Sequence, residues 1–408
     1  MNPVYGWLAE ATPSQRRTLI AAALGWMLDS MDVMLYSLVL GQLQRAMHLT
    51  PAMSGAMVSV TLIAGAAGGI AFGWFADRYG RTRALTYSIL IYSVATALCG
   101  LTQTPLELFL CRLLLGLGMG GEWASGAALV AESWPLEHRN KALSLVQSAW
   151  AIGYGLGAAI VAIVLPRFGW RAVFFTGLLP ALVTLWIRRS LHEPERSQPT
   201  QPATTPQLSR SQLFTHLRRP LIICAAMNAA TLFGWWGLFT WVPHFLSQPV
   251  SAGGRGLSIL QTSGFTIAMQ AGAFLGYVLF GYLADRFEAK PTYIAYLIMA
   301  AILTPAFALA ANSTALLILG PLVGFFGTGY FSGFSILASR QFPAAIRASA
   351  MGFAYNIGRV LSAAAPYLVG WLSQSAGLSY ALAATAAAFA LAALIATALA
   401  PNPLGESS

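Results

Sequence analysis

Charge is scarce in this sequence. Only 9% of its 408 residues are charged, while 57% are hydrophobic, and an ordinary soluble domain carries roughly 25% charged residues. Two long stretches, residues 291–339 and 360–405, contain no charged residue at all. A soluble protein of this length must cover its surface with polar groups, so the composition excludes that class and predicts an integral membrane protein.

Cysteine is rare, and the sequence has no cleavable leader pattern. The three cysteines, Cys99, Cys111 and Cys224, lie in apolar segments without the spacing of a metal site or a disulfide, so we interpret them as packing residues. Residues 1–17 contain no short apolar core followed by a small-residue cleavage site. The first apolar segment is therefore expected to stay in the membrane.

The patterns on which pumps and intramembrane enzymes depend are also missing. No G-x-x-x-x-G-K-[ST] nucleotide-binding loop occurs, which argues against ATP-driven transport, and no Gly-x-Ser-x-Gly elbow follows a strand. Each histidine falls in a loop or at the end of an apolar segment, which excludes a histidine relay or a zinc site within the bilayer: His48, His138, His192, His216 and His244. We expect no enzyme, no metal and no cofactor.

Apolar runs separated by charge, proline and glycine predict an all-α integral membrane protein with twelve transmembrane helices. The six in the first half are expected near 18–43, 54–76, 84–103, 105–133, 141–166 and 172–188. The six in the second half are expected near 220–247, 258–284, 291–311, 315–339, 347–373 and 377–400.

The distribution of basic residues predicts the orientation. With a cytoplasmic N-terminus, seventeen Lys and Arg residues fall on the inside and four on the outside, so both termini are expected in the cytoplasm of a multi-pass plasma (inner) membrane protein. This topology accounts for the net charge of +10 without a nucleic-acid partner. The expected partners are membrane lipid and a small organic acid, and the expected state is a monomer.

A polar segment divides the chain into two halves. Residues 196–213 are rich in Ser, Pro, Thr and Gln and cannot bury a core. We predict an N-terminal six-helix bundle at 1–189, a cytoplasmic linker at 190–218 and a C-terminal six-helix bundle at 219–408.

The two halves share an internal repeat. The sequence GWFADRY, from Gly73, recurs as GYLADRF, from Gly281, at an offset of 208 residues. The same offset carries Gly116 onto Gly324, Pro135 onto Pro343, Arg139 onto Arg347 and Ala142 onto Ala350. This register predicts a duplicated unit and two pseudo-symmetric bundles.

Residues 73–83 (GWFADRYGRTR) resemble the loop signature of the major facilitator superfamily and depart from it only at Thr82. The resemblance implies alternating access and a conformational latch between charged helix ends. The alternative is a solvated charge cluster that only sets topology. In the second copy Glu288, Ala289 and Lys290 replace the glycine-arginine run, which predicts a weaker latch there. The candidate latch residues are Gly73, Asp77, Arg78, Gly80, Arg81, Glu132, Arg139, Asp285, Arg286, Arg340 and Arg347.

Further motifs resemble one group within that superfamily. Residues 112–122 (RLLLGLGMGGE) resemble the fourth-span motif of the whole superfamily, in which the glycines permit close helix packing. Residues 29–32 (DSMD), 121–123 (GEW), 131–135 (AESWP) and 356–359 (NIGR) resemble the metabolite:proton symporters of the sialate, lactate and aromatic-acid groups. The fifth span lacks the Gly-Pro signature of drug:proton antiporters, which argues against an antiporter of that group.

Five charged residues fall inside the predicted spans: Asp29, Asp32, Arg112, Glu122 and Arg359. Unpaired, they would cost on the order of 12–18 kcal/mol on insertion scales, so they must pair or line a wet cavity. Asp29 and Asp32 are three residues apart and share a helix face, and two such carboxylates favour holding a proton on one of them. We therefore interpret the four N-terminal residues as proton-coupling, with Arg112 as counter-ion to Asp32. The alternative is a permanent structural ion pair.

Arg359 is the predicted anchor for substrate. The C-terminal spans contain no acid to neutralise it, and a planar guanidinium binds a carboxylate through two hydrogen bonds. Alternatively, it pairs with Asp29 or Asp32. Other candidate substrate-binding residues are Tyr36, Gln147, Asn228, Tyr330 and Asn356, each of which could instead bond between helices. Trp235 and Trp236 are candidates to cap the cavity, to pack or to form an outer gate.

These observations predict a secondary transporter that moves a small organic anion, such as sialate, lactate or an aromatic acid, together with protons. A sugar:proton symporter is the first alternative, although a neutral sugar would give Arg359 no charge partner. A drug or metabolite antiporter and a non-transporting membrane receptor are further alternatives.

Overall fold

The computed structural model describes residues 8, 10–182, 210–343 and 347–399. Most of the predicted linker, residues 190–209, lies outside this range, as do the side chains of Glu132, Arg139 and Arg347. The described residues form helices joined by short connections, as the apolar periodicity predicts.

The described part of the N-terminal half contains five long helices. They are α2 (Pro13–Met47), α3 (Pro51–Tyr79), α4 (Arg81–Cys99), α5 (Pro105–Ser133) and α6 (Leu136–Phe175), followed by the short turn η1 (Thr176–Leu178). The boundary between the predicted fifth and sixth spans lies inside α6, where non-helical backbone at Gly169 (φ 76°, ψ 176°) separates two helices at a kink.

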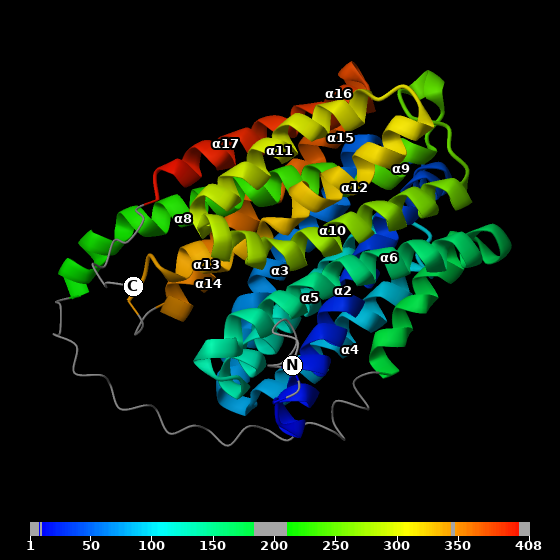
Figure 1. Cartoon of the computed structure of the whole chain (residues 1–408). Coiled ribbons are helices and arrows are strands. Elements are labelled where there is room, and N and C mark those ends of the chain that lie inside the picture. The colour runs from blue at the N-terminus through cyan, green and yellow to red at the C-terminus, as the bar shows by residue number, and fades with distance from the viewer. Residues whose placement is uncertain (1–7, 9, 183–209, 344–346, 400–408) are drawn as a thin grey trace.

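The C-terminal half repeats this plan with more breaks. Its helices are α8 (Arg210–Phe239), α9 (Val242–Ser247), α10 (Ile259–Phe287), α11 (Ala289–Leu309), α12 (Ser313–Gly329), α13 (Phe331–Ser339), α14 (Arg347–Ser362), α15 (Ala364–Ala376), α16 (Leu378–Ala384) and α17 (Ala386–Thr397), with the turn η2 (Val250–Ala252) after α9. Four predicted spans are each formed by two consecutive helices: α8 with α9, α12 with α13, α14 with α15, and α16 with α17. Figure 1 shows the two halves side by side.

Three helices of the N-terminal half begin with the same dipeptide. Thr12, Thr50 and Thr104 each precede a proline, and each threonine hydroxyl oxygen accepts a hydrogen bond from a backbone N–H in the first turn. A threonine at the N-cap accepts a hydrogen bond from a backbone N–H that has no partner within the helix. Proline at the first helical position has a φ angle already fixed near the helical value. These caps fix where α2, α3 and α5 start.

Close helix packing follows the internal repeat. A Cβ atom on Gly116 of α5 would collide with the carbonyl of Thr61 on α3, and a Cβ atom on Gly324 of α12 would collide with the carbonyl of Met269 on α10. Both members of the second pair lie 208 residues after those of the first. The same relation holds between the Gly68–Leu117 contact and the Gly276–Phe325 contact. The duplication is therefore present in the packing as well as in the sequence.

The contact of Gly120 gives a stability prediction. Its Cβ position overlaps the carbonyl of Gly65 and lies 2.5 Å from the backbone nitrogen of Gly69. Gly120→Ala should therefore push α5 away from α3 and destabilise the protein by about 1–3 kcal/mol, seen as a lower midpoint in a thermal melt of the purified protein. The matched control is Gly264→Ala, because a Cβ atom there meets nothing within 4 Å. Equal melting temperatures for the two variants would contradict the prediction.

The two ends of the bundle differ. At the end where α2 stops, here called the Met47 end, a Cβ on Gly55 of α3 would collide with the carbonyl of Pro366, and one on Gly370 of α15 would collide with that of Pro51. At the opposite end, here called the Gly80 end, Cβ atoms on Gly73 and Gly281 would meet no atom of the described residues within 4 Å. The halves are thus in backbone contact toward the Met47 end.

The turn at the Gly80 end is repeated with a different residue. Gly80 connects α3 to α4 with φ 106°, and Glu288, 208 residues later, connects α10 to α11 with φ 66°. This region of backbone conformation favours glycine, so the glutamate carries local strain. The altered sequence of the second loop retains the same turn.

Candidate substrate and proton site

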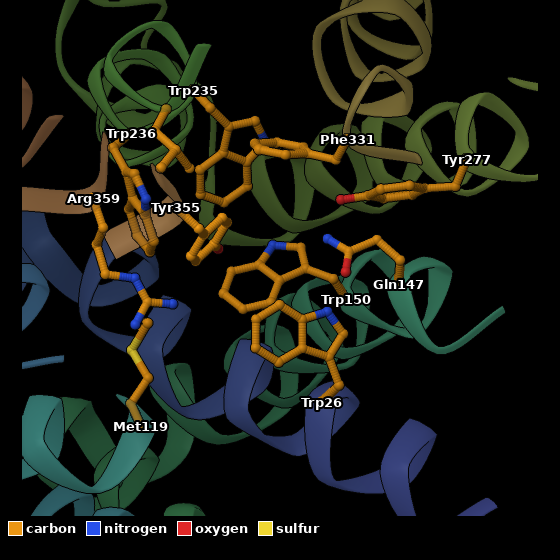
Figure 2. A pocket seen from close by; sticks show the side chains of 11 residues that line it. Trp26, Met119, Gln147, Trp150, Trp235, Trp236, Tyr277, Phe331, Tyr355 and Arg359 are labelled. Carbon is orange, nitrogen blue, oxygen red and sulfur yellow. The ribbon is translucent and has the colours of Figure 1, made fainter. Parts of the chain in front are cut away.

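A cavity lies between the two halves at mid-height. Its walls come from α2, α5 and α6 on one side and from α8, α10, α13 and α14 on the other (Figure 2). It leaves about 30 Å³ open to the centres of water molecules, which is room for about two waters. This volume of about 30 Å³ is far below the several hundred Å³ of typical ligand sites, so the walls must move apart before a substrate can enter. The lining residues are Trp26, Met119, Gln147, Trp150, Leu232, Trp235, Trp236, Tyr277, Phe331, Tyr355 and Arg359.

Four tryptophans dominate the wall. The ring centroids of Trp26 and Trp150 are 4.8 Å apart, and those of Trp235 and Trp236 are also 4.8 Å apart. Trp150 joins the two pairs across the halves, with its centroid 5.6 Å from that of Trp235. Indole faces and edges at such spacings form a polarisable surface suited to a flat ring. Trp235 and Trp236, the predicted caps, form part of this cluster.

Arg359 brings the positive charge to the cavity. Its side chain is 4% exposed, and its guanidinium carbon lies 5.2 Å from the centroid of the Tyr355 ring, one turn earlier on α14. Its Nη1 atom lies 3.4 Å from the Cβ position of Gly65 on α3. The guanidinium therefore reaches across from the C-terminal half to the N-terminal half, where the glycine leaves space for it.

The buried acids lie behind the cavity wall. Asp29 and Asp32 on α2 have no exposed surface, and Glu122 on α5 is 1% exposed. The Thr96 hydroxyl donates to Asp32 Oδ2 at 3.1 Å, whereas both carboxylate oxygens of Asp29 lack a hydrogen-bond partner within the described part of the chain. Asp29 is close enough to Arg359 for electrostatic attraction. Of the five buried charges, all of them described, only Arg359 lines the cavity.

The expected direct pair between Asp32 and Arg112 is not formed. Across the described residues no salt bridge joins them; Arg112 instead lies over the ring of Tyr36, 4.7 Å from its centroid. None of the three guanidinium nitrogens has a hydrogen-bond partner in the described structure. Asp32 points toward Thr96 of α4 and Gly177 of η1, so the two groups interact only at longer range.

The predicted polar residues fall into two groups. Gln147 lines the cavity and faces the hydroxyl of Tyr277 from the other half (Figure 2). Asn356 lies one turn from Arg359 on α14 but does not line the cavity, and its Nδ2 donates to the carbonyl of Gly352 at 3.0 Å.

The remaining three bond between helices or along the chain. The Tyr36 and Tyr330 hydroxyls donate to the carbonyls of Ser54 and Thr231, each at 3.0 Å, and Asn228 Nδ2 donates to the carbonyl of Tyr355 at 3.1 Å. All three side chains are fully buried and lie away from the cavity lining. Asn228 thereby holds the backbone of α14 near Arg359.

The latch residues gather at the Gly80 end. Arg81 Nη2 donates to Asp77 Oδ1 at 2.8 Å, which ties α3 to α4 within one half. Arg78 and Arg286 lie near the rings of Tyr79 and Phe287, and Asp285 and Arg340 are exposed. Because the side chains of Glu132, Arg139 and Arg347 fall outside the described residues, the latch between halves remains a prediction.

Comparison with known proteins places the chain in a family. The model of the family described as "Major Facilitator Superfamily" matches residues 22–269 and 249–408. The chain belongs to the Major Facilitator Superfamily, and its fold is the twelve-helix architecture of that family.

Within this family, the chain is similar to proteins named as transporters of metabolites. A protein of Cupriavidus pinatubonensis named "Probable 4-methylmuconolactone transporter" is 34% identical, with 93% of this chain and 89% of that protein covered. The cis,cis-muconate transport protein of Acinetobacter baylyi is 29% identical (92% and 91% covered). The sialic acid transporter NanX of Escherichia coli is 30% identical (94% and 93% covered). The chain is thus similar to transporters of organic acids.

Solved structures share the fold at low sequence identity. The crystal structure of a bacterial homolog of the human lysosomal transporter Spinster, in its inward-facing and unoccupied conformation, has a TM-score of 0.77 at 17% identity and covers 95% of this chain and 98% of that one. A D-xylose-proton symporter has a TM-score of 0.77 at 20% identity, with 97% and 100% covered. Both similarities concern the fold alone.

Proposed function

We propose that this protein is a symporter that carries a flat, unsaturated organic monocarboxylate together with a proton. The observation that carries this proposal is the buried guanidinium of Arg359 on the wall of a cavity formed by four tryptophans. A carboxylate would neutralise the guanidinium through charge-assisted hydrogen bonds, while a ring would lie against the indoles.

The lining favours an aromatic acid over the other predicted substrates. A sialate carries many hydroxyl groups, each of which needs a hydrogen-bond partner when it is buried. The described lining offers few beyond Gln147, Tyr277 and Tyr355. Lactate has no ring to occupy the aromatic surface. A neutral sugar would leave Arg359 without a charge partner, which argues against the sugar alternative.

Proton coupling is proposed to act through the acids behind the wall. With one proton held by the carboxyl pair of Asp29 and Asp32, the attraction of this pair for Arg359 is weaker, and the guanidinium is free to bind the substrate carboxylate. After substrate release, loss of the proton restores a negative charge near the guanidinium. The three acids and two arginines sum to −1 when the site is empty and deprotonated, and one proton plus one monocarboxylate leave that sum unchanged. The loaded and empty forms would therefore cross the membrane with similar charge.

The proposed orientation puts the Gly80 end in the cytoplasm, because most basic residues gather there. The backbone contacts at the Met47 end would then make this an inward-facing conformation, closed to the outside. In the outward-facing conformation of the same transport cycle, the Met47 end would be open.

The test is uptake of nicotinate, a flat aromatic monocarboxylate, into proteoliposomes with an alkaline interior. One proton per anion and a pH difference of one unit support about tenfold accumulation. Nicotinamide, its neutral amide of the same shape, and D-xylose should not accumulate, and a protonophore should abolish nicotinate accumulation. Protein-free liposomes give the passive background. Accumulation of xylose with no response to nicotinate would overturn the proposal.

A further inference from the structure

A second, larger cavity lies at the Met47 end. It is bounded by α2 and α6 of the N-terminal half and by α9, the following loop and the start of α10 of the C-terminal half. It leaves about 710 Å³ open to the centres of water molecules, against about 30 Å³ in the central cavity, and the two share no lining residue. On α6 the linings are separated by the stretch from Trp150 to Val161, which spans about 16 Å of helix.

Buried polar atoms without partners line this outer cavity. His244 of α9 and Thr262 of α10 are each 6% exposed. Neither His244 Nδ1 nor Thr262 Oγ1 has a hydrogen-bond partner among the described residues, and the same is true of Oε1 of the neighbouring Gln248. Buried polar groups are rarely left unsatisfied, so three such atoms around one space indicate that a polar molecule completes them. The sequence alone places His244 at the end of a span and predicts no role for it.

The charge of the outer cavity is positive. Arg45, in the last turn of α2, is the one Lys, Arg, Asp or Glu among the described residues that line it. Arg45 Nε donates to the carbonyl of Gly41 at 3.1 Å, which holds the guanidinium beside the lining. A histidine, hydroxyl and amide groups and a single guanidinium, with no competing acid, suit a small anion.

Packed residues between Trp150 and Val161 separate this space from the central cavity. The Tyr154 hydroxyl of α6 donates to the carbonyl of Phe239 on α8 at 2.9 Å, joining the halves between the two cavities. Leu38 of α2 lies at the inner boundary of the outer cavity and packs 3.3 Å from the Cβ position of Gly157 on α6. An anion in the outer cavity would therefore lie on the path to the central cavity, behind a closed gate.

We propose that the outer cavity is a second binding site for the organic monocarboxylate, occupied before the Met47 end opens to the central site. The chemical class of the ligand rests on the proposed function, whereas the site rests on His244, Thr262, Gln248 and Arg45. The outer site binds more weakly than the central one, because its arginine is exposed to solvent and it lacks the tryptophan cluster.

The test is equilibrium binding of radiolabelled nicotinate to the purified full-length protein, with nicotinamide as the neutral control. Wild type should show a tight and a weak class of sites. Arg359→Ala should remove the tight class and leave the weak one. Arg45→Gln should weaken the weak class about tenfold or more, the loss of one charge-assisted hydrogen bond, and leave the tight class intact. Thr262→Val, which keeps the side-chain shape, should weaken the same class about threefold or more.

The matched control is Arg167→Gln, an exposed arginine near the same end that does not line the cavity. It should leave both classes unchanged. A weak class that survives both Arg45→Gln and Thr262→Val, or one that Arg167→Gln reduces equally, overturns the outer site. If instead Arg359→Ala leaves the tight class intact, the proposed central function fails, while the Arg45 and Thr262 variants still decide the outer site.

Discussion

Asp32→Asn should abolish uphill uptake of the monocarboxylate while leaving exchange measurable. The asparagine keeps the size of the side chain and an oxygen that can accept from Thr96, whose hydroxyl lies 3.1 Å from Asp32 Oδ2. It cannot take up or release a proton. The accumulation ratio should therefore fall from about tenfold, the value that one proton per anion supports across one pH unit, to about one.

The measurement compares two assays on one preparation of proteoliposomes. Net uptake driven by a pH gradient reports coupling, and counterflow of labelled against unlabelled nicotinate reports binding and reorientation alone. Glu10→Gln is the control, because Glu10 is an exposed carboxylate before α2. Wild-type accumulation by Asp32→Asn would refute the coupling role, and loss of both net uptake and counterflow would show that Asp32 serves the structure instead.

Arg359→Ala should weaken monocarboxylate binding by at least about 30-fold. Truncating one partner of a buried, hydrogen-bonded charge pair costs about 2–5 kcal/mol, and 2 kcal/mol already corresponds to about 30-fold. Arg359→Lys should also bind weakly, because an ammonium keeps the charge but loses the planar pair of donors. The neutral amide should bind wild type and both variants with similar, low affinity.

Equilibrium binding of nicotinate to the purified protein measures this effect. Arg219→Ala is the control, since Arg219 is exposed near the start of α8. An affinity in Arg359→Ala equal to that of wild type would exclude Arg359 as the carboxylate anchor. A loss in nicotinamide binding as large as the loss in nicotinate binding would mean that the variant damages the cavity instead of removing an anion partner.

The fold could be predicted because its signals are local or periodic. Long uncharged stretches leave few alternatives to membrane helices, and the repeated GWFADRY and GYLADRF segments define the duplication. Buried charges such as Arg359 stand out in sequences this poor in charge. The break between the fifth and sixth spans could be predicted as well, because the non-helical Gly169 lies between their predicted ranges, 141–166 and 172–188.

The walls of the cavities could not be predicted in the same way. Trp26, Trp150 and Trp235 lie on three different helices, and only helix packing brings their rings together. Sequence distance likewise hides the outer cavity, where His244 meets the last turns of α2. The expected pair of Asp32 and Arg112 illustrates the opposite error: opposite charges at similar depth need not face each other, and here Tyr36 lies under the guanidinium.

The most direct test is an experimental structure of the protein with nicotinate bound. The account predicts that the carboxylate lies on the guanidinium of Arg359, between α3 and α14, and that the pyridine ring lies among Trp26, Trp150, Trp235 and Trp236. The account would be contradicted if nicotinate bound elsewhere, if Arg359 formed an ion pair with Asp29, and if the four tryptophan rings made no contact with the ligand.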